Sequence, residues 1–138
     1  MSGAAARPAL AVLLAVVAVF GGGCGGPFIA FPGGALRGEV VSEPPVDWSF
    51  VDSQFMDLEV RPDDPYSVTI NYFVRDGTLY IDPAESREWF TYLQQDDRVR
   101  VRFGFDDRVY LLRAVQVGKP GELEGFDADR FVYRLDPR

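Results

Sequence analysis

The chain has 138 residues, with 14 Lys and Arg against 21 Asp and Glu, and a net charge of −7. An acidic chain without a basic run is unsuited to nucleic-acid binding, which needs cations for the phosphates. The chain has no histidine and one cysteine, which excludes histidine-based nucleophilic catalysis, His-ligated zinc, an intrachain disulfide and a thiolate metal cluster.

The first predicted element is a signal peptide over residues 1–23. One cation, Arg7, precedes an unbroken apolar run from Ala9 to Phe20. As a helix this run would span about 18 Å, against the roughly 30 Å of a bilayer core. Such a run is too short for a comfortable transmembrane anchor and is typical of a signal-peptide core. Small residues and the lone Cys24 follow it.

The residues before Cys24 resemble the lipobox of bacterial lipoproteins, in which the cysteine is acylated and becomes the first residue of the mature chain. Gly22 and Gly23 match the pattern, and Gly21 stands where a leucine is usual. The resemblance implies that Cys24 is lipidated and that the protein is anchored in the bacterial cell envelope, facing the periplasm or the surface. Ordinary secretory cleavage and a buried structural cysteine are the alternatives.

Residues 24–35 are rich in glycine and proline and are expected to form a tether to a domain over residues 36–138. In that domain the period of the apolar residues predicts one helix over 83–95, which buries Trp89, Phe90 and Leu93. After a weak first strand over 36–41, strands are predicted over 55–60, 66–75, 78–81, 98–103, 108–117 and 131–135. Asp76-Gly77 is predicted to make a hairpin turn.

About six strands and one helix in so short a chain favour a mainly β fold, a small six-stranded split β-barrel of Greek-key type, because closure removes exposed strand edges.

Three cations of one strand, Arg98, Arg100 and Arg102, fall on the same face. They are expected to face solvent and acids of the partner strand at residues 106–107, although such a row could also line a pocket for an acidic ligand. The paired aspartates lack the spacing of a calcium loop, so no metal site is predicted.

Residues 65–117 resemble the split-barrel flavin-binding superfamily, which includes pyridoxamine-phosphate oxidase and the deazaflavin-dependent nitroreductases. The resemblance lies in the stretches PYSVTINYFVRDGTLYI, SREWFTYLQQDDRVRVRF and VYLLRAVQV. It implies a flavin mononucleotide (FMN) or deazaflavin cofactor bound between the subunits of a homodimer. It also implies that Ser86 and Arg87 hold a phosphate, as the Ser-Arg-Lys run of pyridoxamine-phosphate oxidase does.

Three positions depart from the family pattern. Glu88 stands where the family has a lysine, Ile81 where a threonine binds phosphate, and Val68 where an arginine is expected. The loss of two cations and a hydroxyl would weaken phosphate binding by several kcal/mol, at about 1.5–3 kcal/mol for each charged hydrogen bond. A purely structural role for Ser86 and Arg87, as a helix-start residue and a solvated arginine, therefore stays open.

Trp48 could stack on the ring of a ligand, or it could anchor a loop in an apolar cluster with Val46 and Phe50.

Two functions remain open. One is a lipid-anchored flavin- or deazaflavin-dependent oxidoreductase, for which the sequence marks no catalytic residue. The other is a non-enzymatic lipoprotein whose barrel binds a protein partner or a small ligand without a redox cofactor.

Overall fold

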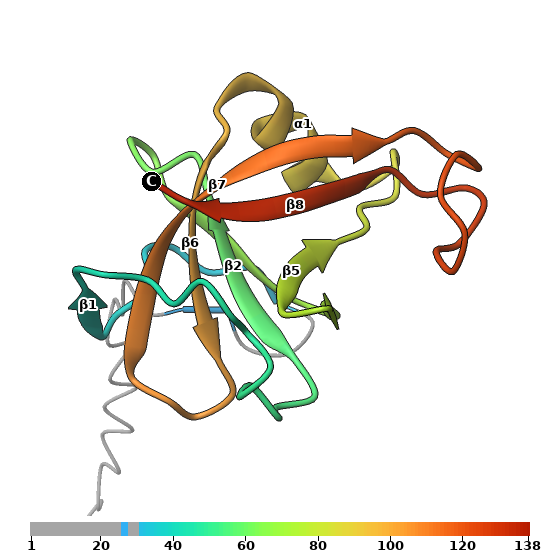
Figure 1. Ribbon diagram of the computed structural model, residues 1–138. Helices are drawn as coiled ribbons and strands as arrows, with labels where there is room; N and C mark the ends of the chain where they lie inside the picture. Colours follow the sequence, from blue (N-terminus) through green and yellow to red (C-terminus); the bar gives the residue numbers. More distant parts are fainter. Residues whose placement is uncertain (1–25, 28–30) are drawn as a thin grey trace, which may run out of the picture.

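The computed structural model describes residues 26–27 and 31–138, so the predicted signal peptide and Cys24 lie outside the described residues. The described chain forms eight strands and one helix around one hydrophobic core (Figure 1). The elements are β1 (Glu39–Val41), β2 (Met56–Val60), β3 (Tyr66–Ile70), β4 (Phe73–Arg75), β5 (Thr78–Ile81), α1 (Glu88–Gln95), β6 (Arg98–Phe103), β7 (Arg108–Gly118) and β8 (Val132–Pro137).

One long, bent segment brings the two edges of the sheet together. The strand order is β3-β2-β6-β7-β8-β5-β4, and β1 adds in parallel to the start of β7. Only Asn71 and Tyr72 separate β3 from β4, so the segment predicted as one strand pairs with β2 through its first half and with β5 through its second. The mainly β split barrel with one helix is confirmed, with eight strands in place of six because this segment is broken and β1 is counted.

Local patterns predicted most of the core correctly. The inner residues of β6, Val99, Val101 and Phe103, alternate with half-buried arginines, as a period of two requires. The predicted hairpin turn is confirmed, with φ of 50° at Asp76 and 75° at Gly77. The apolar face of α1 is confirmed as well, since all three of the residues expected to be buried there are buried.

The helix is shorter than predicted, because residues 83–87 pair with a distant loop. Ala84 forms a β-bridge with Arg130, and the N–H of Phe131 donates to the carbonyl of Pro83 at 3.2 Å. These contacts hold the segment in an extended form and a turn, and α1 begins only at Glu88.

The arginines of β6 have different partners from those expected. Arg100 pairs with Glu59 at 3.3 Å and Arg102 with Asp57 at 2.9 Å, and Arg98 pairs with Asp96 and Asp63. The prediction of acids at residues 106–107 was therefore wrong for all three. The register gives the reason for Arg100 and Arg102: β6 lies between β2 and β7, and their two acids stand directly opposite them on β2.

Residues 31–37, the strap, lie along the outer side of the barrel. Gly33 and Ser67 exchange two backbone hydrogen bonds of 2.9 Å, which joins the strap to β3. The N–H of Leu36 donates to the buried carboxylate of Glu59 at 2.7 Å, which joins it to β2. The strap part of the predicted tether is therefore attached to the barrel.

Candidate functional site

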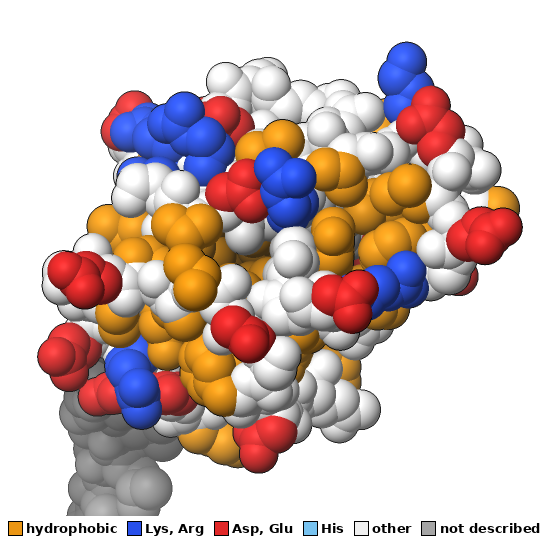
Figure 2. Space-filling view, in the orientation of Figure 1, with side chains coloured by type: hydrophobic (Ala, Val, Ile, Leu, Met, Phe, Trp, Pro, Cys, Tyr) orange, Lys and Arg blue, Asp and Glu red, His pale blue; other side chains and the backbone are white. Residues whose placement is uncertain are grey.

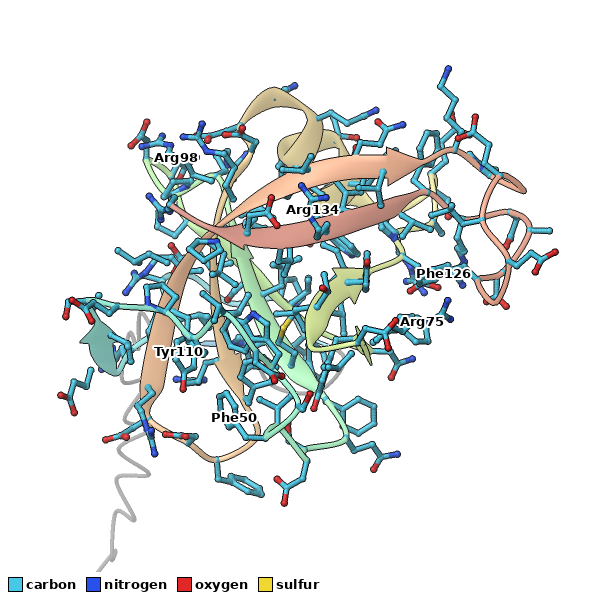
Figure 3. All side chains as sticks on the ribbon, in the orientation of Figure 1. Phe50, Arg75, Arg98, Tyr110, Phe126 and Arg134 are labelled. Atoms are coloured by element: carbon cyan, nitrogen blue, oxygen red, sulfur yellow. The ribbon has the colours of Figure 1, made fainter. Side chains whose placement is uncertain are left out.

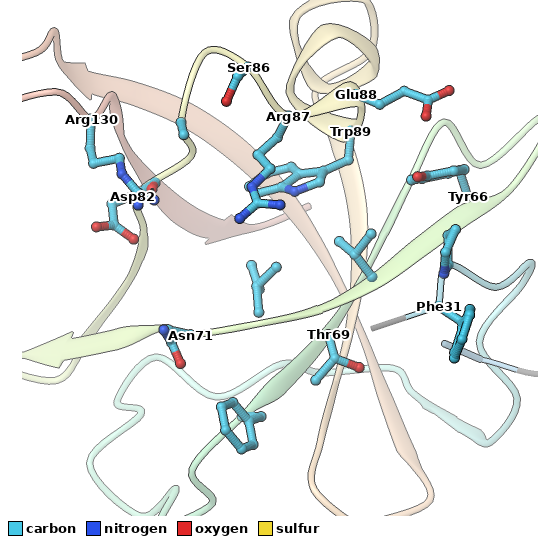
Figure 4. Close-up of a pocket in the computed structure, with 15 residues that line it drawn as sticks. Phe31, Tyr66, Thr69, Asn71, Asp82, Ser86, Arg87, Glu88, Trp89 and Arg130 are labelled. Atoms are coloured by element: carbon cyan, nitrogen blue, oxygen red, sulfur yellow. Dashed lines mark hydrogen bonds between the residues drawn. The ribbon is translucent and has the colours of Figure 1, made fainter. Parts of the chain in front are cut away.

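A pocket of about 570 Å³ opens between β3, the loop from β5 to α1 and the first turn of α1 (Figure 4). This hollow, the α1 pocket, has a size typical of small-molecule sites. Its lining combines aromatic, apolar and charged side chains: Phe31, Pro32, Phe55, Tyr66, Val68, Thr69, Ile70, Asn71, Asp82, Ala84, Ser86, Arg87, Glu88, Trp89 and Arg130.

Ser86 and Arg87 reach the pocket because the chain turns sharply before α1. The N–H of Arg87 donates to the carbonyl of Ala84 at 3.1 Å, which closes the turn. Figure 4 shows the Arg87 side chain directed into the pocket beside Trp89, a residue that is 7% exposed. Both residues predicted to bind phosphate, which are neighbours in the chain, thus line the pocket together with Trp89.

Arg87 carries a charge that is open to a ligand. Its side chain is exposed and forms no ion pair with any residue that the structure describes. The neighbouring carboxylate of Glu88 is engaged elsewhere, since it accepts a hydrogen bond of 2.5 Å from the hydroxyl of Tyr92. That bond raises the pKa of Tyr92. Figure 4 shows Arg87 and Glu88 pointing apart, so the acid at the position where the resemblance expects a lysine leaves the arginine available.

Asp82 and Arg130 line the pocket beside the loop that carries Ser86 and Arg87. Burial raises the pKa of Asp82, and the guanidinium of Arg130 offsets this only in part. Nη1 of Arg130 donates to the backbone carbonyl of Asp82 at 3.2 Å. Its Nε is buried without a hydrogen-bond partner among the described residues and lies 3.6 Å from the carboxylate of Asp129. This part of the lining therefore holds a carboxyl group with a raised pKa and a second guanidinium.

The floor of the pocket comes from β3 and the bend that follows it. The hydroxyl of Thr69 donates to Asp57 at 2.8 Å and is committed to the barrel, whereas Asn71 is exposed at the bend. Val68, where the resemblance expects an arginine, lines the pocket with apolar surface alone. Ile81, where a phosphate-binding threonine is expected, is fully buried in the core.

Trp48 lies apart from Ser86 and Arg87. It is 2% exposed, does not line the α1 pocket, and packs against Phe103 and Tyr110 with ring centroids 5.6 Å and 5.1 Å away. These contacts support its packing role. Cys24, the predicted lipidation site, is not among the residues that the structure describes.

Sequence reasoning did not single out Asp82, Asn71 or Arg130 as site residues. Asp82 directly follows a strand, which is a weak signal. Arg130 is 48 residues away from Asp82 along the chain, and it reaches the pocket only through the β-bridge between its loop and Ala84. No local pattern marks such a residue.

Other kinds of site receive no support from the described part of the chain. Within it, no group of three or more Cys, Asp or Glu side chains is placed to hold a metal ion. No helix in the same ranges is long and apolar enough to cross a bilayer.

Comparisons with known proteins give one likeness of fold. No family model matches the chain, and no curated protein matches it. The chain is similar to a solved Listeria innocua structure named "Putative Pyridoxamine 5'-phosphate oxidase", with a TM-score of 0.48 and 17% identity over 62% of this chain and 84% of that one. This likeness concerns the fold alone.

Proposed function

We propose that the protein is a lipid-anchored domain of the bacterial cell envelope whose α1 pocket binds a small anionic ligand with a planar ring. The observation that carries this proposal is the guanidinium of Arg87, which enters a ligand-sized pocket without an ion pair to another described residue. Arginine binds phosphate and carboxylate groups through two parallel hydrogen bonds. The ring of Trp89 and the hydroxyl of Ser86 lie in the same lining.

Flavin mononucleotide and deazaflavins are the ligand class that these residues fit first. Arg87 and Ser86 would hold the phosphate, and Trp89 would lie near the ring. Such a cofactor supplies redox chemistry when bound, and the protein orients it and sets its surroundings. Val68 supplies no cation, so binding is expected to be weaker than in a pocket with two or three, by about 1.5–3 kcal/mol for each charged hydrogen bond lost.

An absorbance and fluorescence titration of the full-length protein in detergent, with FMN and with a deazaflavin, tests the proposal. Saturable binding near micromolar, which corresponds to about −8 kcal/mol, is the expected result. Arg87→Ala should lower that affinity about 10- to 100-fold, the equivalent of about one charged hydrogen bond.

Arg113→Ala is the matched control. Arg113 is also a surface arginine, with a side chain 52% exposed and a loose 3.6 Å contact to Asp97, and it does not line the α1 pocket. Its substitution should leave binding unchanged. Equal affinity in the Arg87→Ala and parent proteins would overturn the assignment of the anion site.

The apolar lining at Val68 favours a second candidate, a non-enzymatic lipoprotein that binds a ligand or partner without a redox cofactor. Failure of both FMN and the deazaflavin to bind at high micromolar concentrations would exclude the redox function in favour of this one.

The homodimer implied by the family resemblance remains a prediction, and light scattering of the detergent-solubilised protein would test it.

The lipid anchor rests on the sequence around Cys24. Cys24→Ala should abolish acylation, measured by labelling cells with a radioactive fatty acid, and should shift the protein out of the membrane fraction. Continued membrane association of the parent protein without acyl labelling would overturn the lipidation of Cys24.

A further inference from the structure

A second hollow, the aromatic groove, lies where the turn between β6 and β7 meets the loop before β2. It has a volume of about 1070 Å³, and its lining is mainly apolar. Phe50, Phe55 and Phe105 line it and remain 58%, 45% and 110% exposed. Figure 3 shows Phe50 and Tyr110 at this end, and in Figure 2 hydrophobic side chains gather over the lower half of the same face. Exposed apolar groups gathered in this way mark an interaction surface.

Most of the charged residues in the groove are paired with one another. Arg102 pairs with Asp57 at 2.9 Å, and Arg108 contacts Asp106 at 3.3 Å. Asp52 is the remaining charged residue of the lining. Because a partner recognised by charge needs unpaired groups, the groove favours a partner with an apolar surface bordered by polar groups.

The N-terminal part of the chain reaches the barrel beside this groove. Pro27 lines the groove, and Gly26 lies against Arg102, where an added Cβ would stand 2.6 Å from Nη2. Cys24 is two residues before Gly26, and two residues of extended chain span at most about 7 Å. An acyl group on Cys24 would therefore begin next to the groove.

We propose that the aromatic groove docks on the surface of a lipid bilayer, with its three exposed phenylalanines in the interfacial region. This inference rests on the lipidation of Cys24 proposed above. Apolar aromatic side chains beside polar groups are suited to the level of the headgroups. Because the anchor holds the groove within a short reach of the bilayer, docking is intramolecular and needs only weak contacts. A second copy of the chain has no such link to the groove.

Docking on the bilayer would also place the α1 pocket near the membrane. The two hollows adjoin, and Phe55 and Thr69 line both of them. A ligand of the α1 pocket would then be bound close to the headgroups.

Lipid quenching of a fluorophore at the groove tests the inference. Phe105→Cys in the full-length lipidated protein provides a labelling site that is fully exposed, so the core is undisturbed. Leu123→Cys is the matched control: it is also an exposed apolar position, 37% exposed, in the loop at the opposite end of β7. Each protein carries an environment-sensitive dye on the new cysteine and is reconstituted in phosphatidylcholine vesicles that contain lipid spin-labelled on the acyl chain.

The spin label should quench most of the dye fluorescence at residue 105 and little of that at residue 123. Adding Phe50→Asp to the Phe105→Cys protein should reduce the quenching, since a charge at the groove disfavours insertion. Equal quenching at the two sites, or none at residue 105 in a protein that stays on the vesicles, would overturn the docking and leave the anchor intact. A blue-shifted but unquenched dye at residue 105 would overturn it in favour of a second copy. A protein without acyl label would overturn both the anchor and the docking.

Discussion

The α1 pocket and the aromatic groove share part of their lining, yet they use arginine in opposite ways. In the pocket, Arg87 has no ion pair with a described residue and is open to an anion, although Arg130 of the same lining contacts Asp129 at 3.6 Å. In the groove, Arg102 and Arg108 are paired with aspartates, which leaves apolar surface as the means of binding. The partner of an arginine, more than its presence, therefore distinguishes a binding group from a structural one.

The largest expected change in stability comes from substituting Trp48. This residue packs behind the groove against Phe50, Phe103 and Tyr110. Trp48→Ala should lower the free energy of unfolding by about 3–5 kcal/mol, because it removes a large buried side chain. Urea denaturation measures this. Phe105→Ala, at a fully exposed position of the same groove, should change it by no more than about 0.5 kcal/mol. Similar losses in the two variants would contradict the distinction between packing residue and exposed surface.

The attachment of the strap should give the next largest effect. Glu59→Leu leaves the guanidinium of Arg100 without its partner and the N–H of Leu36 without its acceptor. We expect the free energy of unfolding to fall by about 3 kcal/mol, the low end for a broken buried pair because Arg100 is 21% exposed. The control is Asp64→Asn at an exposed pair with Arg61, whose effect on urea denaturation should be negligible. An Asp64→Asn loss as large as that of Glu59→Leu would argue against the strap as the cause.

Substituting Arg87 should affect ligand binding more than stability, and substituting Arg102 should affect stability more than ligand binding. Arg87→Ala should lower FMN or deazaflavin affinity by about 10-fold or more and change the free energy of unfolding by less than about 0.5 kcal/mol. Arg102→Ala should lower the free energy of unfolding and leave the ligand affinity almost unchanged. Arg102 donates hydrogen bonds to Asp57 and to the carbonyl of Arg37, and it does not line the α1 pocket. Parallel ligand titration and urea denaturation measure both quantities. If Arg87→Ala were the destabilised variant, the arginine would be structural.

The smallest effect is a pH dependence from Asp82. Burial raises its pKa in the folded state above the ordinary value of 3.8, so between 3.8 and the folded pKa the folded protein binds more protons than the unfolded chain. Its contribution to stability therefore falls as the pH rises through this interval. Asp82→Asn removes the contribution, so the variant should gain stability relative to the parent as the pH rises, and the difference should level off above the folded pKa. Urea denaturation at several pH values tests this, and a difference that shrinks with rising pH would contradict the burial of Asp82.

Much of the fold could be predicted because its signals are local. The alternation in β6, the Asp76-Gly77 turn and the apolar face of α1 each depend on residues that are neighbours in the chain. The break between β3 and β4 was missed because the segment reads as continuously strand-forming, and it divides only where its two halves pair with different strands. The length of α1 was overestimated because a bridge to Arg130, far along the chain, holds its expected first turn.

The amino-acid pattern was sufficient to predict a small, mainly β barrel, and the family resemblance marked Ser86 and Arg87 as candidate anion-binding residues. The pattern could not show that Asp82 and Arg130 line the same pocket, that Arg100 and Arg102 pair with β2, or that Pro27 lines the aromatic groove. The physical reason is the range of the interactions. Periodicity and turn propensity act over a few residues, whereas ion pairing and the lining of a hollow depend on which strands become neighbours when the sheet curls.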